Sequence, residues 1–89
     1  MEDKYIYTKS INAITYVLYK TMEELDFYVD PIDKQIYFKI PATQENSKYY
    51  YEYKDAVHNN SVLKLDLILF NQIMHEIKFQ TKQFRNNLK

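Results

Sequence analysis

The stretch LDFYVDPIDKQIYFKI, residues 25–40, decides the fold class. Apolar residues alternate with polar ones on both sides of a central polar segment, and a period of two is typical of strands. Asp30 and Pro31 suit the first two corners of a type I turn, because proline presets φ and the carboxylate accepts a local backbone N–H bond. The stretch predicts a two-stranded antiparallel hairpin. One face should join the core, and the other should display Tyr28, Tyr37 and Lys39.

An amphipathic helix is predicted before the hairpin. Apolar residues recur at three- and four-residue steps behind a Thr8 or Ser10 cap, which is the spacing of one helix face. These residues are Ile11, Ile14, Val17, Leu18, Met22 and Leu25. Ahead of the helix, residues 4–8 alternate tyrosine with isoleucine, which favours a short leading strand that can join the hairpin as a third strand.

A second helix is predicted after Pro41, which ends the hairpin. Asn46 or Ser47 is the expected cap, and the helix is expected over residues 48–58 with a left-handed stop at Asn59-Asn60. The residues expected on its core side are Tyr49, Tyr53, Ala56 and Val57.

The last helix is predicted to begin after Asp66, a good N-cap, and to run to about Phe84. A helix of that length spans roughly 28 Å, which is more than so small a core needs, so we expect its distal turns to project or to pair with another chain. No repeat, linker or low-complexity tract divides the sequence. Residues 1–89 are therefore predicted as one α+β domain: a helix, the hairpin and two helices on one small core.

Composition argues against catalysis. The chain has no glycine and no cysteine, so glycine-rich phosphate loops, nucleophile elbows and disulfides are excluded. His58 and His75 have no partner at metal-ligand spacing. The acidic residues cluster around the hairpin turn, where solvent evens out differences in pKa. We therefore expect no catalytic residues, no metal and no cofactor.

Charge and hydropathy predict a globular protein of the cytoplasm. Twelve basic and twelve acidic residues cancel, so no global field attracts nucleic acid or an anionic membrane. The start, Met1-Glu2-Asp3, has no basic segment leading into an apolar run, and charged residues interrupt every apolar stretch. We expect neither a targeting segment nor a membrane partner.

Ten tyrosines exceed what one small core can bury. A tyrosine brings apolar area and a hydrogen-bonding tip to an interface at low entropic cost, although tyrosine also replaces leucine in chains from A/T-rich genomes. An interface and a structural role are therefore equal alternatives. The residues predicted to bind a partner lie on the outer hairpin face, at its turn and off the core side of the second helix: Tyr28, Asp30, Asp33, Tyr37, Tyr50 and Tyr51. Tyr5 or Tyr7 is expected to join them.

The carboxyl end of the chain is basic, because no acid follows Glu76. Its cations could contact phosphates, with Phe79 or Phe84 as a stacking ring for a base. Cations also complement the dipole at the end of a helix, so solvated charge is the simpler interpretation. Nucleic-acid binding or regulation through this helix is the alternative function, and a homodimer through it is a third hypothesis. The residues concerned are Lys78, Lys82, Arg85 and Lys89.

Several segments resemble a small phage and prophage family known only as a domain of unknown function. The resemblance lies in residues 8–18 (TKSINAITYVL), the Ile36-Tyr37-Phe38 strand, the Tyr49-Tyr50 pair and the Leu65-Asp66 start of the last helix. It covers most of the chain and departs at Ser10, where the family usually has an acidic residue. It implies a mobile-element protein without catalytic residues, in a bacterial host. By analogy with other small phage proteins, it implies an inhibitor that binds a host protein or ribonucleoprotein complex, such as a CRISPR effector.

Overall fold

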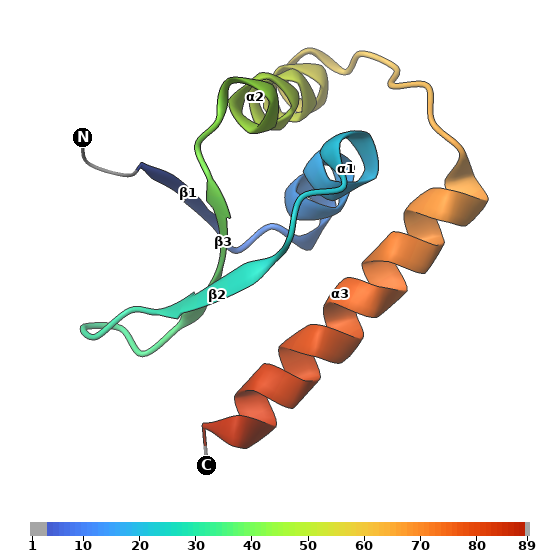
Figure 1. The fold of residues 1–89 in the computed structure, drawn as a ribbon. Coiled ribbons are helices and arrows are strands. Elements are labelled where there is room, and N and C mark those ends of the chain that lie inside the picture. The colour runs from blue at the N-terminus through green and yellow to red at the C-terminus, as the bar shows by residue number, and fades with distance from the viewer. Residues whose placement is uncertain (1–3, 89) are drawn as a thin grey trace.

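The computed structural model describes residues 4–88. Its elements are β1 (Tyr5–Thr8), α1 (Ile11–Thr21), β2 (Asp26–Val29), β3 (Ile36–Pro41), α2 (Gln44–Asn59) and α3 (Leu67–Asn87). β3 lies between β1 and β2 and pairs antiparallel with both. α1 packs against β1 and against both other helices (Figure 1). The predicted α+β class and hairpin are confirmed, and the leading strand does join the sheet.

The two faces of the hairpin are as predicted, and Asp30 and Pro31 begin its turn. Tyr28 pairs with Tyr37 and Phe27 pairs with Phe38, so tyrosines share one face and phenylalanines the other. Asp30 Oδ1 accepts the backbone N–H groups of the two turn residues that follow Pro31, at 2.7 and 3.1 Å. These bonds replace strand pairing at the tip of the hairpin and fix where the chain reverses.

The first helix begins as predicted but ends earlier. Ser10 Oγ accepts the Ala13 N–H at 3.1 Å, which confirms Ser10 as the cap. The helix ends at Thr21 because Met22 adopts the left-handed conformation with φ of 57° and donates its N–H to the Leu18 carbonyl. Met22 is thereby 75% exposed, so the expectation that the apolar helix face continues through Met22 is wrong.

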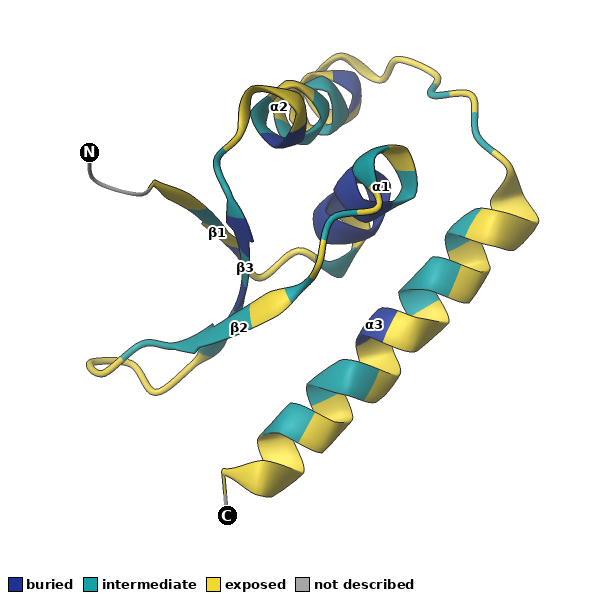
Figure 2. Cartoon of the chain, in the orientation of Figure 1, coloured by how far each residue is buried: buried dark blue, intermediate teal, exposed yellow. Residues whose placement is uncertain are grey.

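The core lies between α1 and the inner face of the sheet. Its buried side chains come from α1, β3 and α3: Ile14, Val17, Leu18, Phe38, Ile40 and Ile77. Figure 2 shows most of the buried residues on α1, with others on β3 and α2, whereas the described part of α3 contributes Ile77 alone. α3 therefore packs on the core through a narrow line of contact.

The second helix begins before its predicted start. Thr43 is the cap, because its Oγ1 accepts the Asn46 N–H at 3.1 Å, and α2 starts at Gln44 rather than at Lys48. Asn46, expected as a cap, lies inside the helix and is buried. Asn60 ends α2 with φ of 55°, which confirms the left-handed stop.

The core side of α2 also differs from the prediction. Tyr50, expected off the core, packs against the core cluster because it lies one turn after the buried Asn46 on the same helix face. Val57, expected on the core side, is 59% exposed. Residues 57–60, at the end of α2, are all exposed, so this end of the helix lies outside the core.

The last helix is capped as predicted and packs along its length. Asp66 Oδ1 accepts the Leu69 N–H at 3.1 Å, and the helix ends at Asn87 rather than at about Phe84. Its distal turns do not project: the Phe84 ring stacks on Phe27 of β2 with 4.7 Å between centroids. Over residues 4–88, we find no helix with the length and apolarity needed to cross a membrane.

Candidate functional site

Four tyrosines from three strands form a continuous surface on the outer face of the sheet. We call this surface the tyrosine face; it consists of Tyr5, Tyr7, Tyr28 and Tyr37. The ring centroids are 6.4 Å apart for Tyr5 and Tyr7, 5.0 Å for Tyr7 and Tyr28, and 6.4 Å for Tyr28 and Tyr37. The closest pair meets edge to face, an arrangement that aromatic quadrupoles favour.

Two lysines lie against the ends of the tyrosine face. Lys39 Nζ is 4.2 Å from the centroid of the Tyr5 ring, and Lys9 Nζ is 5.6 Å from that of Tyr37. Both distances fall within the range of cation–π attraction. Each lysine holds its charge over an aromatic ring, so the tyrosine face is bordered by positive charge at these two positions.

The turn beside the tyrosine face fixes Tyr37. The Tyr37 hydroxyl donates to Asp33 Oδ2 at 2.9 Å, and the Gln35 N–H donates to Asp33 Oδ1 at 2.8 Å. The Gln35 bond chiefly, then the Tyr37 bond and the charge of Lys9, hold the pKa of the Asp33 carboxyl below its ordinary value. The bond to Asp33 raises the pKa of the Tyr37 hydroxyl. At neutral pH the pair is therefore ionised carboxylate and protonated phenol, which orders the ring.

The structure brings together four of the six residues predicted to bind a partner. Tyr28, Asp30 and Tyr37 line a shallow hollow of about 410 Å³ together with Tyr7, and Asp33 adjoins it through its bond to Tyr37. The other two, Tyr50 and Tyr51, lie on α2 and line no part of this hollow.

Comparison with known proteins was made by sequence and by structure. No family model, curated protein or solved structure matches the chain. Within residues 4–88, no three histidine, aspartate or glutamate side chains converge as metal ligands.

The basic residues of α3 share one groove. Lys78, Lys82 and Arg85 line a space of about 440 Å³ whose other walls include Ile11 at the start of α1 and Phe38 of β3. Lys89, the fourth predicted cation, lies outside the described residues. Phe84 is stacked on Phe27 and is therefore engaged in packing rather than free to stack on a base. Phe79 remains exposed.

A buried tyrosine between α1 and α2 was not predicted. Tyr16 is 1% exposed, and its hydroxyl donates to a carboxylate oxygen of Glu52. Burial first, then the hydrogen bond and charge of Glu52, raise the pKa of Tyr16 well above its ordinary value. An amphipathic pattern predicts burial on one side of a helix only, and therefore does not predict that Tyr16 is buried. In the structure every residue from Ala13 to Leu18 is buried, because neighbours cover α1 on several sides.

The Tyr16 hydroxyl should make stability depend on alkaline pH. Its pKa is higher in the folded than in the unfolded protein, so its contribution is complete below about pH 10 and is lost as pH rises toward the folded-state pKa. Relative to Tyr16→Phe, the wild type should lose up to about 1.4 kcal/mol of unfolding free energy per pH unit above pH 10. Urea unfolding of both proteins between pH 8 and about 11.5 measures this difference. If the unfolding free energies of the wild type and Tyr16→Phe changed in parallel over this pH range, the prediction would be wrong.

Proposed function

We propose that this chain is a non-catalytic binding domain that docks on a partner protein through the tyrosine face. The observation that supports the proposal is the continuous series of ring contacts across three strands, on the side of the sheet opposite the buried Phe38 and Ile40. Tyrosine is enriched among the residues that dominate binding energy at protein interfaces. The function is therefore to occupy a surface of another macromolecule, without turnover.

The order of the tyrosine face supports tight binding. Tyr37 is held by Asp33, Tyr28 by its cross-strand partner and Tyr7 by an edge-to-face contact. Rings that are already positioned lose less conformational entropy when a partner binds. The face rests on a paired sheet rather than on a loop, which further limits rearrangement.

The charges around the face favour a protein over nucleic acid. Asp30 lines the hollow and Asp33 adjoins it, so two carboxylates lie where a phosphate backbone would pass. Lys39 lies over the Tyr5 ring and Lys9 over the Tyr37 ring, so positive charge is also present at the edge of the tyrosine face. A rim with both signs of charge matches the polar border of a protein interface.

The class of partner rests on the resemblance of residues 8–18, the Ile36-Tyr37-Phe38 strand and the later segments to a phage family. A phage-encoded binder of this size acts in the host cytoplasm, and its targets there are host proteins or ribonucleoprotein complexes. We propose a defence complex, such as a CRISPR effector, as the target. Inhibition then follows from covering a working surface of that complex.

A panel of purified CRISPR effector–guide complexes tests this assignment. Cleavage of labelled target DNA should be blocked for at least one effector at near-stoichiometric protein. Tyr7→Thr with Tyr28→Thr should weaken that inhibition about 30-fold, from two aromatic contacts of about 1 kcal/mol each. Threonine keeps the preference for strand, so the sheet should remain folded.

Tyr51→Thr is the matched control, because Tyr51 is an exposed tyrosine that lies apart from the tyrosine face on α2. The Tyr51→Thr variant should inhibit DNA cleavage as strongly as the wild type does. If Tyr51→Thr lost inhibition and the Tyr7→Thr, Tyr28→Thr double variant did not, the interface would lie on α2. If no effector in the panel is inhibited, this choice of target is wrong.

The second candidate function is nucleic-acid binding through the basic groove of α3. The observation in its favour is that Lys78, Lys82 and Arg85 converge on one groove with two apolar residues below them. Three phosphate contacts predict that the logarithm of the affinity for a single strand falls with a slope of about −2 against the logarithm of salt concentration. Anisotropy of a labelled oligonucleotide measures this slope. Absence of binding in low salt would eliminate the candidate.

A further inference from the structure

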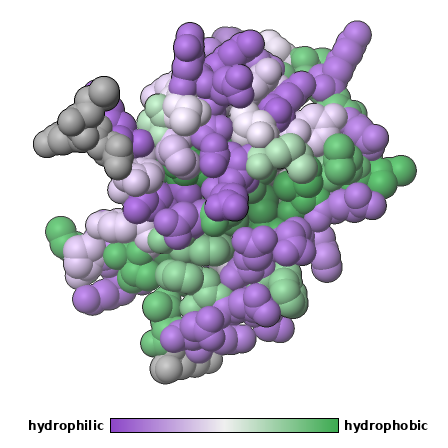
Figure 3. Space-filling view, in the orientation of Figure 1, coloured by the Kyte–Doolittle hydropathy of each residue, from purple (hydrophilic) through white to green (hydrophobic). Residues whose placement is uncertain are grey.

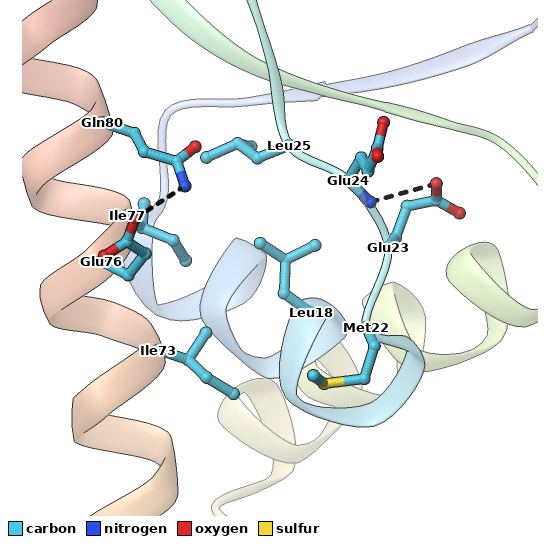
Figure 4. Close-up of a pocket in the computed structure, with 9 residues that line it drawn as sticks. All are labelled: Leu18, Met22, Glu23, Glu24, Leu25, Ile73, Glu76, Ile77 and Gln80. Atoms are coloured by element: carbon cyan, nitrogen blue, oxygen red, sulfur yellow. Dashed lines mark hydrogen bonds between the residues drawn. The ribbon is translucent and has the colours of Figure 1, made fainter.

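A second groove lies on the other side of α3, between that helix and the end of α1. It encloses about 400 Å³. Figure 4 shows apolar side chains from α1, the segment after it and α3 around this space: Leu18, Met22, Leu25, Ile73 and Ile77. Figure 3, in the orientation of Figure 1, shows apolar residues gathered between α1 and α3, with hydrophilic residues around them. We call this space the acidic groove, for the reason given next.

Carboxylates stand on both sides of the groove. Glu23 and Glu24 follow α1 on one side and Glu76 lies on α3 on the other, whereas no lysine, arginine or histidine among residues 4–88 lines the space (Figure 4). Glu23 is held in place, because its Oε2 accepts Asn46 Nδ2 at 3.1 Å. Glu24 and Glu76 are exposed at the rim. A ligand in the groove therefore meets an apolar floor and only negative charge at the edges.

Met22 adds an adaptable apolar side chain to the rim. The left-handed conformation at the end of α1 turns the chain there, and the side chain is exposed rather than packed. An unbranched thioether adjusts to ligands of different shape and is common on surfaces that bind apolar anchors. The protein thus leaves an adaptable hydrophobic residue at the edge of an acid-rimmed groove.

We propose that the acidic groove binds a basic amphipathic segment of another protein. An apolar side chain of that segment contacts Leu18 and Ile73, and lysine or arginine residues beside it face Glu24 and Glu76. The complementary charge orients the segment and excludes acidic ones. This site is separate from the tyrosine face, and the inference does not rest on the proposed function.

The form of the groove favours a peptide over a small ligand. Small-molecule sites are concave pockets that bury most of the ligand surface and orient the ligand with a few precisely placed polar groups. Here the lowest residues, Leu18 and Ile77, are apolar and the carboxylates lie at the open edge. A space between two helices with charge along both rims suits a helix that lays its apolar face into it.

Titration of a labelled peptide tests the proposal. The probe contains only leucine and lysine, with leucines at three- and four-residue steps so that they form one helix face. Fluorescence anisotropy should show saturable binding to the full chain at low salt. A peptide with glutamate in place of lysine, and one with serine in place of leucine, should each bind at least about tenfold more weakly.

Paired variants locate the site. Glu24→Gln with Glu76→Gln should reduce affinity for the leucine–lysine peptide about tenfold, because both facing charges are lost. Glu45→Gln with Asp55→Asn makes the same change in net charge on the exposed side of α2, away from the groove, and should leave affinity within about twofold. Equal losses in the two double variants would show attraction by overall charge and would overturn the proposal.

A third variant separates binding from folding. Met22→Asn removes the apolar side chain, while asparagine tolerates the left-handed backbone that Met22 adopts. Thermal stability should be unchanged or higher, and affinity for the peptide should fall about threefold to fivefold. Unchanged affinity would remove Met22 from the site. The proposal would be overturned if the wild type showed no saturable binding of the peptide. It would also be overturned if light scattering showed a dimer that the peptide cannot dissociate, because the occupant of the groove would then be a second copy of the chain.

Discussion

Replacing Ile77 with alanine is expected to lower the free energy of unfolding by about 3 kcal/mol, within the range of roughly 2–5 for a buried isoleucine. Ile77 is 2% exposed and is the residue through which α3 enters the core cluster. Alanine leaves a cavity that neighbouring side chains cannot fill, because α3 contacts the core along a single narrow line. Small domains have only about 5–15 kcal/mol of stability, so this one substitution removes a large share of it.

Urea unfolding followed by circular dichroism measures the loss, and Phe79→Ala is the control. Phe79 lies on the same helix, just two positions from Ile77, but is 52% exposed, so its truncation should cost less than about 1 kcal/mol. Hydrogen exchange should show α3 opening before α1 in Ile77→Ala. Similar losses of unfolding free energy in Ile77→Ala and Phe79→Ala would mean that the packing of α3 does not depend on the Ile77 contact.

The Ile77 contact matters for function as well as for stability. The basic groove and the acidic groove both take one wall from α3, with Lys78, Lys82 and Arg85 on one side and Glu76 on the other. Undocking α3 would open both grooves together. The tyrosine face contains no residue of α3 and should keep its activity in any Ile77 variant that remains folded.

The elements that the sequence predicts best are those fixed by local physics. The reversal at Asp30 and Pro31 depends on side-chain bonds to adjacent backbone groups, and the caps at Ser10 and Asp66 depend on bonds three residues away. Each of these is a contact between near neighbours in the chain. The alternation around the turn likewise places Tyr28 and Tyr37 on one face without knowledge of the rest of the fold.

The sequence predicted that Tyr5 or Tyr7 would join the outer tyrosines, and the structure brings both to the tyrosine face. Tyr5 and Tyr7 join it only because β1 pairs with β3 across more than thirty intervening residues. Alternation in residues 4–8 suggested a strand, but it did not specify which edge of the hairpin that strand would occupy. Tyr50 and Tyr51 lie on the second helix as predicted, but Tyr50 packs against the core and neither residue lines the hollow beside the tyrosine face.

The grooves beside α3 show a similar limit. Separate acidic and basic segments are visible in the sequence, yet their placement on opposite sides of one helix depends on how α3 crosses α1. Glu23 and Glu24 meet Glu76 across a groove although some fifty residues separate them in the chain. Helix packing supplies this information, and a pattern of charges along the chain does not contain it.

Asn46 is the clearest case in which tertiary contacts overrode a local preference. Thr43 and Asn46 can both cap a helix, and the local sequence does not choose between them. Asn46 Nδ2 donates to the Pro41 carbonyl at 2.9 Å and to Glu23 Oε2 at 3.1 Å, and the residue is 1% exposed. These partners hold Asn46 inside α2, so Thr43 becomes the cap. The amide thereby ties together β3, α2 and the segment after α1.

Asn46→Ala should accordingly cost about 2–4 kcal/mol of unfolding free energy, because it leaves a partly buried peptide carbonyl and a partly buried carboxylate without their donor. Thr43→Ala, which removes only a cap, should cost about 1 kcal/mol. Asn46→Asp keeps the size but sets a carboxylate against Glu23 and the Pro41 carbonyl. It should be at least as destabilising at pH 7 and should recover partly below about pH 4, where the new carboxyl holds a proton and can donate again. Urea unfolding of the three variants at both pH values measures these differences, and a loss for Asn46→Ala no larger than that for Thr43→Ala would show that the buried amide bonds add nothing.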